Sequence, residues 1–327
     1  MWLNEGMLLD ILYGVTLILI MVIASGATVG IFEKLAHDIR TNRLMLASVL
    51  VGFSTSLPEL FVGVAAALRG QPQIALGDIV GANLANLSWI IGGAALVFGS
   101  VPVIGDYLRK ELWVTMGIAM FPFILISDGK LSRFDGLVLV LLYFIYVNNL
   151  VRNGNSPLKH LKLSGRKPVV HRLKTRMEPL VETIKLVVGL GVLGVCAWML
   201  INVVIRISSS WGVSPFWVGL VILATGTTLP ELVLTIVASE KREISLILGN
   251  VLGSVVVNST LILGIISLIS PIVYVESLQR GISGLFLLIV LGLFWLFTKT
   301  KHKLDRWEGA VLVGVYAMFV GIQLMLA

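Results

Sequence analysis

Charged residues are scarce in this chain of 327 residues, since Asp, Glu, Lys and Arg make up 13% of it and hydrophobic residues 57%. A soluble domain cannot bury that much apolar surface, so a water-soluble globular protein is excluded. Cysteine occurs once, as Cys196, which rules out an intramolecular disulfide. No nucleophile paired with a base, metal triad or phosphate-binding loop is recognisable, and the sequence therefore gives no support for an enzyme or for a bound cofactor.

Long apolar runs are abundant instead. A helix needs about 20 apolar residues to cross the roughly 30 Å of hydrocarbon in a bilayer. Ten such runs predict an all-α, polytopic membrane protein with ten transmembrane helices, and they lie near residues 8–30, 44–67, 74–98, 110–127, 132–150, 180–205, 214–238, 244–270, 281–298 and 307–326.

The basic residues are distributed unevenly over the connections between these runs. Of the 25 Lys and Arg residues, 20 fall in the first, third, fifth, seventh and ninth connections and 5 in the others. Because cytoplasmic connections of membrane proteins are enriched in Lys and Arg, this places the central basic loop, residues 151–179, in the cytoplasm and both termini outside the cell membrane. That loop contains no aromatic residue for base stacking, so nucleic acid is not an expected partner. Anionic lipid headgroups are a second interpretation of its charge, and no obligatory protein partner is indicated.

An internal repeat divides the chain. Residues 50–92 align without a gap to residues 222–264, and 12 of the 43 positions are identical. Pro, Glu, Asn and several Gly recur in register, which two unrelated apolar helices would not match. We therefore predict two five-helix repeats, residues 1–150 and 180–327. Because five is an odd number, the second repeat enters the membrane from the opposite side, and the repeats are inverted.

The segments STSLPEL and GTTLPEL interrupt the second and seventh apolar runs near their middle. Proline lacks an amide hydrogen and crowds the carbonyl four residues earlier, so Pro58 and Pro230 predict broken helices with free carbonyl oxygens. Such carbonyls are cation ligands. Hydroxyl groups on the same turns come from Thr55, Ser56, Thr227 and Thr228.

Glu59 and Glu231 follow these prolines directly. A carboxylate at mid-membrane costs at least about 2.5 to 3.5 kcal/mol on insertion scales, and it is rare there unless it is paired or functional. No Lys, Arg or His lies at a comparable depth in any apolar run. Two carboxylates match the charge of one divalent cation, and an all-oxygen donor set suits calcium and sodium.

Asn86 and Asn258 recur at the same offset from the two glutamates, each on the apolar run that follows its glutamate. Their amides are expected to return to the depth of the glutamates, as cation ligands or as hydrogen-bond donors to the carboxylates, although Asn in membrane helices also bonds between helices. Ser254 faces the same way one turn earlier, while Ala82 takes its place in the first repeat. For Asp78, a wet interface, a helix cap and a binding role all remain open.

These motifs resemble those of the cation/calcium antiporter superfamily, in particular its prokaryotic sodium/calcium exchanger branch. Two LPE segments, each followed by a Gly-rich segment ending in Asn, are similar to the two alpha repeats of that family. The resemblance implies a site at which one calcium ion competes with about three sodium ions. It implies the ligands Glu59, Glu231, Thr55, Ser56, Thr227, Thr228, Asn86, Asn258 and Ser254, with the backbone carbonyls of Gly52 and Ala224.

The sequence departs from that family pattern at several positions. Ser54 replaces a common glycine, and Ala82 replaces a serine ligand, which would weaken one sodium site. Asn258 stands where some relatives have Asp, so the expected central charge is minus two, as in potassium-independent members. Leu57 and Pro58 stand where the calcium/proton branch typically has Gly-Asn.

The expected function is therefore exchange of calcium for sodium by alternating access. A calcium/proton antiporter and a passive cation channel are the alternatives. The four histidines, His37, His160, His171 and His302, all lie in connections, which argues against a histidine relay for protons. Inverted repeats with broken helices favour a carrier over a channel.

Overall fold

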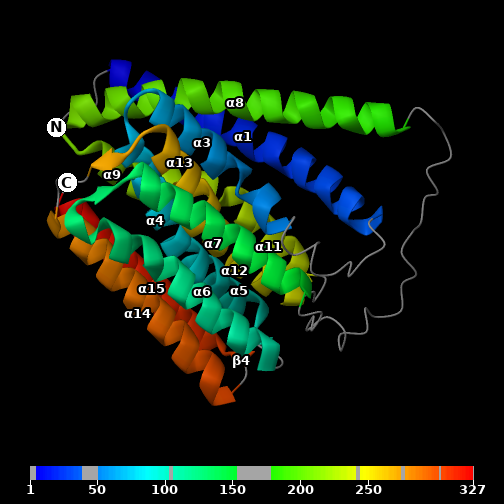
Figure 1. Cartoon of the computed structure of the whole chain (residues 1–327). Helices are drawn as coiled ribbons and strands as arrows, with labels where there is room; N and C mark the ends of the chain where they lie inside the picture. Colours follow the sequence, from blue (N-terminus) through cyan, green and yellow to red (C-terminus); the bar gives the residue numbers. More distant parts are fainter. Residues whose placement is uncertain are drawn as a thin grey trace.

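The computed structural model describes residues 5–38, 51–102, 106–152, 178–240, 244–273, 277–301 and 303–326. The central basic loop, apart from its ends, and the start of the second predicted span lie outside these ranges. The described part of the chain is mostly helical, as the apolar runs predict (Figure 1).

The labelled helices of the first half occur in the following order along the chain. They are α1 (Glu5–Asp38), α3 (Leu57–Leu68), α4 (Pro72–Ala85), α5 (Ile91–Phe98), α6 (Asp106–Leu125) and α7 (Arg133–Arg152). The second half contains α8 (Glu178–Trp211), α9 (Pro215–Trp217), α10 (Ala224–Thr227), α11 (Leu229–Glu240), α12 (Ile244–Val257), α13 (Leu263–Ile269), α14 (Ser277–Lys301) and α15 (Arg306–Met325).

Helix boundaries recur between the two halves. Helices α11 and α12 begin and end at the positions that the sequence repeat aligns with the ends of α3 and α4. Wider π-helical turns follow α4 at Asn86–Ile90 and α12 at Asn258–Ile262, and these two turns are aligned by the repeat in the same way. The repeated sequence thus folds into repeated local structure, including its irregular turns.

Two short strand pairs join the halves. Strand β1 (Val101–Pro102) pairs antiparallel with β4 (Lys303–Leu304), and β2 (Lys130–Leu131) pairs antiparallel with β3 (Ile272–Val273). Each pair takes one strand from each half, so the halves are joined through the connections between their helices as well as through the helices themselves.

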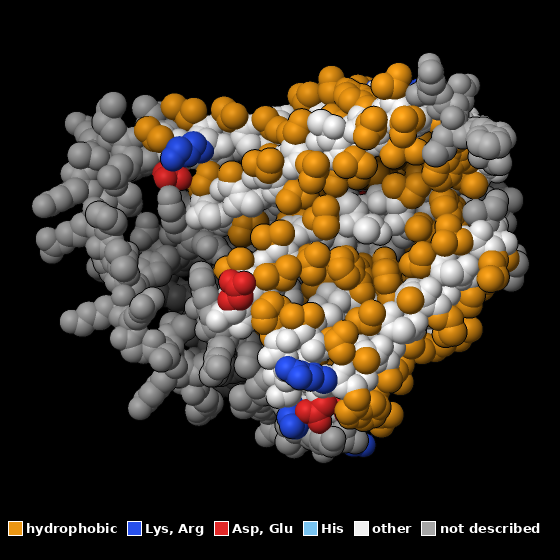
Figure 2. Space-filling model, turned by 180° about the vertical axis from the view of Figure 1, so that it is seen from behind, with side chains coloured by type: hydrophobic (Ala, Val, Ile, Leu, Met, Phe, Trp, Pro, Cys, Tyr) orange, Lys and Arg blue, Asp and Glu red, His pale blue; other side chains and the backbone are white. Residues whose placement is uncertain are grey.

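The lipid-facing character of the surface is plain in Figure 2, where hydrophobic side chains cover most of the visible face and charged ones gather near its margins. On α1, the side chains of Leu9 and Ile23 are 66% and 74% exposed. Among the described residues, seven helices are long and apolar enough to cross a membrane, and three shorter apolar helices span Leu57–Leu68, Leu112–Asp128 and Gly281–Phe297. This is the pattern of a multi-pass membrane protein.

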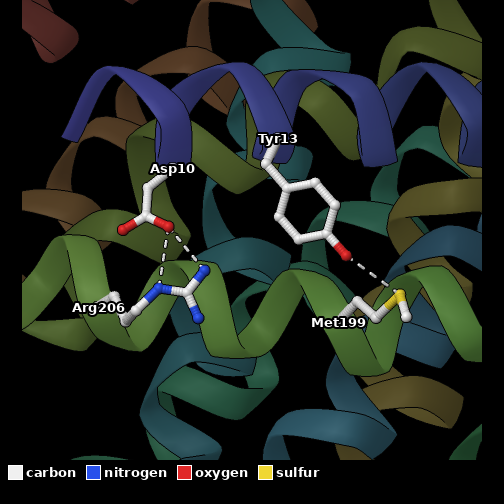
Figure 3. Close-up of polar contacts among 4 residues, drawn as sticks. All are labelled: Asp10, Tyr13, Met199 and Arg206. Carbon is white, nitrogen blue, oxygen red and sulfur yellow. Dashed lines mark hydrogen bonds and ion pairs between the residues drawn. The ribbon is translucent and has the colours of Figure 1, made fainter. Parts of the chain in front are cut away.

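Helices α1 and α8 lie side by side along one side of the bundle, away from α14 and α15 (Figure 1). Two polar contacts join them (Figure 3). The Arg206 guanidinium donates to Asp10 Oδ1 at 2.7 and 2.9 Å, and the Tyr13 hydroxyl donates to Met199 Sδ at 3.4 Å. The two long helices are therefore linked near one end by side chains as well as by apolar packing.

Helix α4 packs backbone to backbone against residues 215–224. A Cβ atom added at Gly81 would stand 2.5 Å from Ala224 Cβ and overlap the Leu220 carbonyl oxygen. Gly77 and Gly219 face backbone oxygens of the opposite segment in the same way. Only glycine permits this approach, which brings the polar residues of α4 next to the break in the opposite half.

Candidate functional site

Two helix breaks position the glutamates that recur in the repeats. At Ser56 the backbone leaves the helical region, with φ of −82° and ψ of 9°, and at Thr228 the values are −81° and 0°. Helices α3 and α11 begin at the next residue, with Pro58 and Pro230 in their first turns. The predicted breaks are thus present at the predicted positions, and each places a glutamate in the first turn of a new helix.

Glu231 lies among three neutral oxygen groups from other parts of the site. Thr55 Oγ1 donates to Asn250 Oδ1 at 2.9 Å and lies 3.1 Å from Ser254 Oγ. Ser254 Oγ is 3.4 Å from Glu231 Oε1. We call Glu231, Thr55, Asn250 and Ser254 the Glu231 half-site. The Gly52 carbonyl oxygen borders it, 3.2 Å from Thr55 Oγ1 and 3.4 Å from Ser254 Oγ.

A second cluster is built from the equivalent positions. Thr227 Oγ1 donates to Asp78 Oδ1 at 2.9 Å, and Thr227 also lies close to Glu59. We call Glu59, Thr227 and Asp78 the Glu59 half-site. Each half-site thus combines a threonine at one helix break with a residue of α4 or α12 from the opposite half.

The Ala224 carbonyl oxygen borders the second break. It accepts the Thr228 hydroxyl at 2.7 Å and the Thr228 amide at 3.2 Å, and it lies 3.5 Å from Thr227 Oγ1, whose single proton goes to Asp78. Because a hydroxyl can donate and accept at once, Thr228 can keep its bond while its oxygen lone pairs face an ion.

Unpaired oxygen atoms are concentrated here. Glu59, Glu231, Asn86 and Asn258 are fully buried. Both carboxylate oxygens of Glu59, Oε2 of Glu231, the Asn86 amide and Oδ1 of Asn258 have no hydrogen-bond partner among the described residues. Burying a carboxylate without a partner is costly. Glu231 and Asp78 are moreover close enough to repel Glu59 when the carboxylates are ionised. A cation could therefore serve as the missing partner of these oxygens.

The remaining predicted oxygens lie on the same turns. Ser56 is fully buried and its Oγ has no partner among the described residues. The fold consequently brings the side chains predicted from both repeats to the region of the two breaks, while their role as ligands stays a prediction.

The position of Asp78 differs from one of the alternatives that the sequence left open for it. Its side chain is fully buried and bonded to Thr227, so the alternative of a wet interface is wrong. With Glu59 and Glu231 it brings the acidic groups of the region to three, and the expected charge of minus two at the centre between the glutamates stays a prediction. No three His, Cys, Asp or Glu side chains in the described part of the chain are arranged to hold one metal ion together.

Asn83 and Ser259 were missed by sequence reasoning. Asn83 Nδ2 donates to Ser259 Oγ at 2.8 Å, and Asn258 Nδ2 donates to Asn83 Oδ1 at 3.3 Å. This fixes the Asn258 amide with its oxygen unpaired. Asn83 aligns with Val255 and Ser259 with Leu87, so a search for polar residues that recur in both repeats misses both. The signal that could have found them is a polar residue inside an apolar run.

Replacing Asn83 with Ala is expected to release the Asn258 amide and lower calcium affinity. The loss of a residue that orients a ligand typically costs about tenfold or more in metal affinity. Calcium-dependent thermal stabilisation of the purified protein would measure it. Asn202→Ala in α8, where the amide oxygen accepts a hydrogen bond from Arg69, serves as the control. An Asn83 variant with unchanged calcium affinity would contradict the role.

The chain is similar to known proteins over most of its length. A family model described as sodium/calcium exchanger protein matches residues 9–151 and 182–325, which is most of the chain. The chain belongs to this family. This confirms the resemblance seen in the sequence motifs. The chain is therefore a cation/calcium exchanger, which is a multi-pass membrane transporter and not an enzyme.

Individual relatives cover most of its length. The sodium/calcium exchanger MaX1 of Methanosarcina acetivorans is 26% identical over 320 residues, covering 88% of this chain and 91% of the relative. The putative antiporter CaxA of Alkalimonas amylolytica is 25% identical over 300 residues, covering 90% and 91%. The inner membrane protein YrbG of Escherichia coli is 30% identical over 240 residues, covering 70% of each chain.

A solved structure has the same fold. The sodium-calcium exchanger NCX_Mj, soaked with Na⁺ and Sr²⁺, superimposes with a TM-score of 0.67 at 24% identity, covering 96% of this chain and 98% of the other. The exchanger fold therefore extends over both halves.

Proposed function

We propose that this exchanger moves calcium against sodium by alternating access, through a site centred on Glu59 and Glu231. The observation that carries the proposal is the pair of fully buried carboxylates, one at each helix break, with no basic partner among the described residues. A hydroxyl oxygen lies beside each, that of Ser254 beside Glu231 and that of Thr227 beside Glu59. MaX1, a relative over most of the chain, is a sodium/calcium exchanger, which supports the same pair of ions.

The proposed ligands are those expected from the motifs. They comprise the carboxylates of Glu59 and Glu231, the hydroxyls of Thr55, Ser56, Thr227, Thr228 and Ser254, the amides of Asn86 and Asn258, and the carbonyls of Gly52 and Ala224. Calcium prefers six to eight oxygen ligands at about 2.3 to 2.6 Å. A site with two carboxylates and adjustable hydroxyls also suits sodium.

Coupling follows from the buried charge. With no ion bound, the site keeps unpaired carboxylates inside the membrane, and this state is unfavourable for the passage between outward-open and inward-open forms. Calcium or several sodium ions relieve the charge. Helices α1 and α8, which are linked to each other, are the proposed moving unit. Ile18 of α1 contacts Gly226 at the second break, and Gly189 of α8 contacts Thr28 of α1.

The decisive experiment imposes one gradient at a time on proteoliposomes that contain the purified protein. We expect calcium uptake when sodium is high inside and absent outside, and none with a potassium gradient. Uptake driven by a pH gradient without sodium would instead identify a calcium/proton antiporter. Calcium conductance with no countertransport would identify a channel.

We also propose ten membrane crossings in two inverted repeats, residues 1–150 and 180–327, with both termini outside and the central loop cytoplasmic. The strand pairs support this, because β1 and β4 lie in connections assigned to the cytoplasm, and β2 and β3 in connections assigned to the outside. A pairing across the membrane would contradict the assignment.

Corresponding connections in the two repeats are expected to face opposite sides. Cys196 is the single cysteine and is buried, so Cys196→Ser gives a clean background. In it, Lys130→Cys should react with an impermeant maleimide added to intact cells, and Lys303→Cys should react only after the membrane is opened. Labelling of both from the same side would contradict inversion.

A further inference from the structure

The two half-sites are not equal. Thr55 bonds an amide oxygen, that of Asn250, whereas Thr227 bonds a carboxylate oxygen, that of Asp78, at the same distance of 2.9 Å. Asp78 and Asn250 are equivalent in the repeat. The Glu231 half-site also has the Ser254 hydroxyl, and its equivalent in the Glu59 half-site is Ala82. One half-site therefore has an extra hydroxyl, and the other an extra negative charge.

Asp78 is incompletely satisfied. Its Oδ2 has no hydrogen-bond partner among the described residues, and the side chain is fully buried. The ion pairs found in the described part of the chain lie elsewhere, for instance between Arg206 and Asp10. A buried carboxylate with one free oxygen and no basic partner is unfavourable in its ionised form, and a bound cation would offset that cost.

Such a cation is not one that both glutamates share. No three acidic side chains among the described residues are placed to ligate one metal ion. Calcium held by Glu59 and Glu231 would therefore leave Asp78 uncompensated, with a net charge of minus one in the region. A separate monovalent ion would remove this charge.

We propose that Asp78 and Thr227 form a sodium-binding subsite in the Glu59 half-site, distinct from the centre between the two glutamates. This rests on the proposed function. Asp78 Oδ2 is the charged ligand and Thr227 Oγ1 a neutral one. The Leu223 carbonyl, 3.2 Å from Thr227 Oγ1, is a third. The carboxylate of Asp78 takes over the role of the hydroxyl that Ala82 lacks.

Three carboxylates and three sodium ions balance in charge, whereas one calcium ion leaves a charge of minus one. Sodium binding at Asp78 thus makes the fully sodium-loaded site neutral. It also allows sodium to remain at Asp78 while calcium occupies the centre.

The test measures binding of radiolabelled sodium and of radiolabelled calcium to the purified full-length protein in detergent. We compare the wild type with Asp78→Asn, which copies the natural residue of the other half-site. The half-saturating sodium concentration should rise by about tenfold or more, the order expected when a metal site loses a supporting group. Calcium binding measured without sodium should change far less. Asp128→Asn, in an exposed connection where Oδ1 accepts a hydrogen bond from the Lys130 amide, is the matched control and should change neither.

Suppose that the wild type binds sodium and exchanges calcium for it, but Asp78→Asn binds sodium as the wild type does. This result would overturn the sodium subsite and leave the proposed function standing. Equal losses of sodium and calcium binding would also overturn the subsite, since Asp78 would then serve the central ion. A wild type that binds no sodium would overturn the proposed function as well. If Asp78→Asn does not yield folded protein, Asn250→Asp is titrated instead. It creates a second threonine–carboxylate pair and should lower the half-saturating sodium concentration; no change would overturn the subsite.

Discussion

Glu59→Gln and Glu231→Gln are each expected to abolish calcium exchange. Calcium sits about 2.4 Å from its oxygen ligands. Removal of one of two charges at such a distance costs several kcal/mol even at an effective dielectric constant of about 20. Since each 1.4 kcal/mol is about tenfold in affinity, calcium binding should weaken by at least about a hundredfold. Sodium-driven calcium uptake into proteoliposomes measures the loss.

Thermal unfolding separates this effect from misfolding. Calcium should stabilise the wild type because it binds only the folded state. Both variants should lose that stabilisation. Without ions they should melt above the wild type, because Gln keeps the shape of the side chain but cannot carry a buried charge that its acidic neighbours would repel. Glu182→Gln, at a half-buried side chain paired with Lys185, should behave as the wild type. A Glu59 variant that keeps calcium-induced stabilisation and transport would remove the central assignment.

Gly81→Ala is expected to destabilise the fold and to inactivate transport, although the added group is a single methyl. Its Cβ would overlap the Leu220 carbonyl oxygen and stand 2.5 Å from Ala224 Cβ. Backbone cannot rotate away as a side chain can, so α4 must move off the opposing segment. Overpacking typically costs about 1 to 3 kcal/mol, and the shift would also displace Asp78 from Thr227.

Gly93→Ala is the matched control, because it also adds a methyl to a helical glycine and meets nothing within 4 Å. It should be neutral or stabilising by up to about 1 kcal/mol. Melting temperature in detergent and calcium uptake would be compared for both variants. If Gly81→Ala matched Gly93→Ala in both, the close approach of α4 would have no structural importance.

Prediction from sequence succeeded where the two repeats agree. Glu59 and Glu231, the prolines before them and the two asparagines recur in register, and the structure brings them into one buried region. Recurrence was informative because the corresponding segments of the two halves pack against each other. The apolar runs in the described part of the chain correspond to helices for an elementary reason, since a crossing segment must be long, apolar and internally hydrogen-bonded.

Prediction failed where the repeats differ. Asp78 aligns with Asn250, and Asn83 with Val255, so neither recurs, and periodicity along one helix cannot tell which neighbour each side chain meets. The burial of Asp78 depends on Gly77 and Gly81, which let α4 reach the break in the other half. Two helices also continue beyond the predicted apolar runs. Helix α1 ends at Asp38 and α8 at Trp211, whereas the runs end near residues 30 and 205, because polar residues beyond the apolar run continue the helix.

The pairing of strands between the two halves has an evolutionary consequence. Strand β1 pairs with β4 and β2 with β3, and Thr55 and Thr227 likewise reach across to Asn250 and Asp78. All of these contacts would form just as well between two separate polypeptides of five helices inserted in opposite directions. The covalent tether raises the local concentration of one partner for the other without adding an interaction of its own. An ancestral antiparallel homodimer could therefore have assembled before gene fusion, and only afterwards could one copy acquire an aspartate that the other lacks.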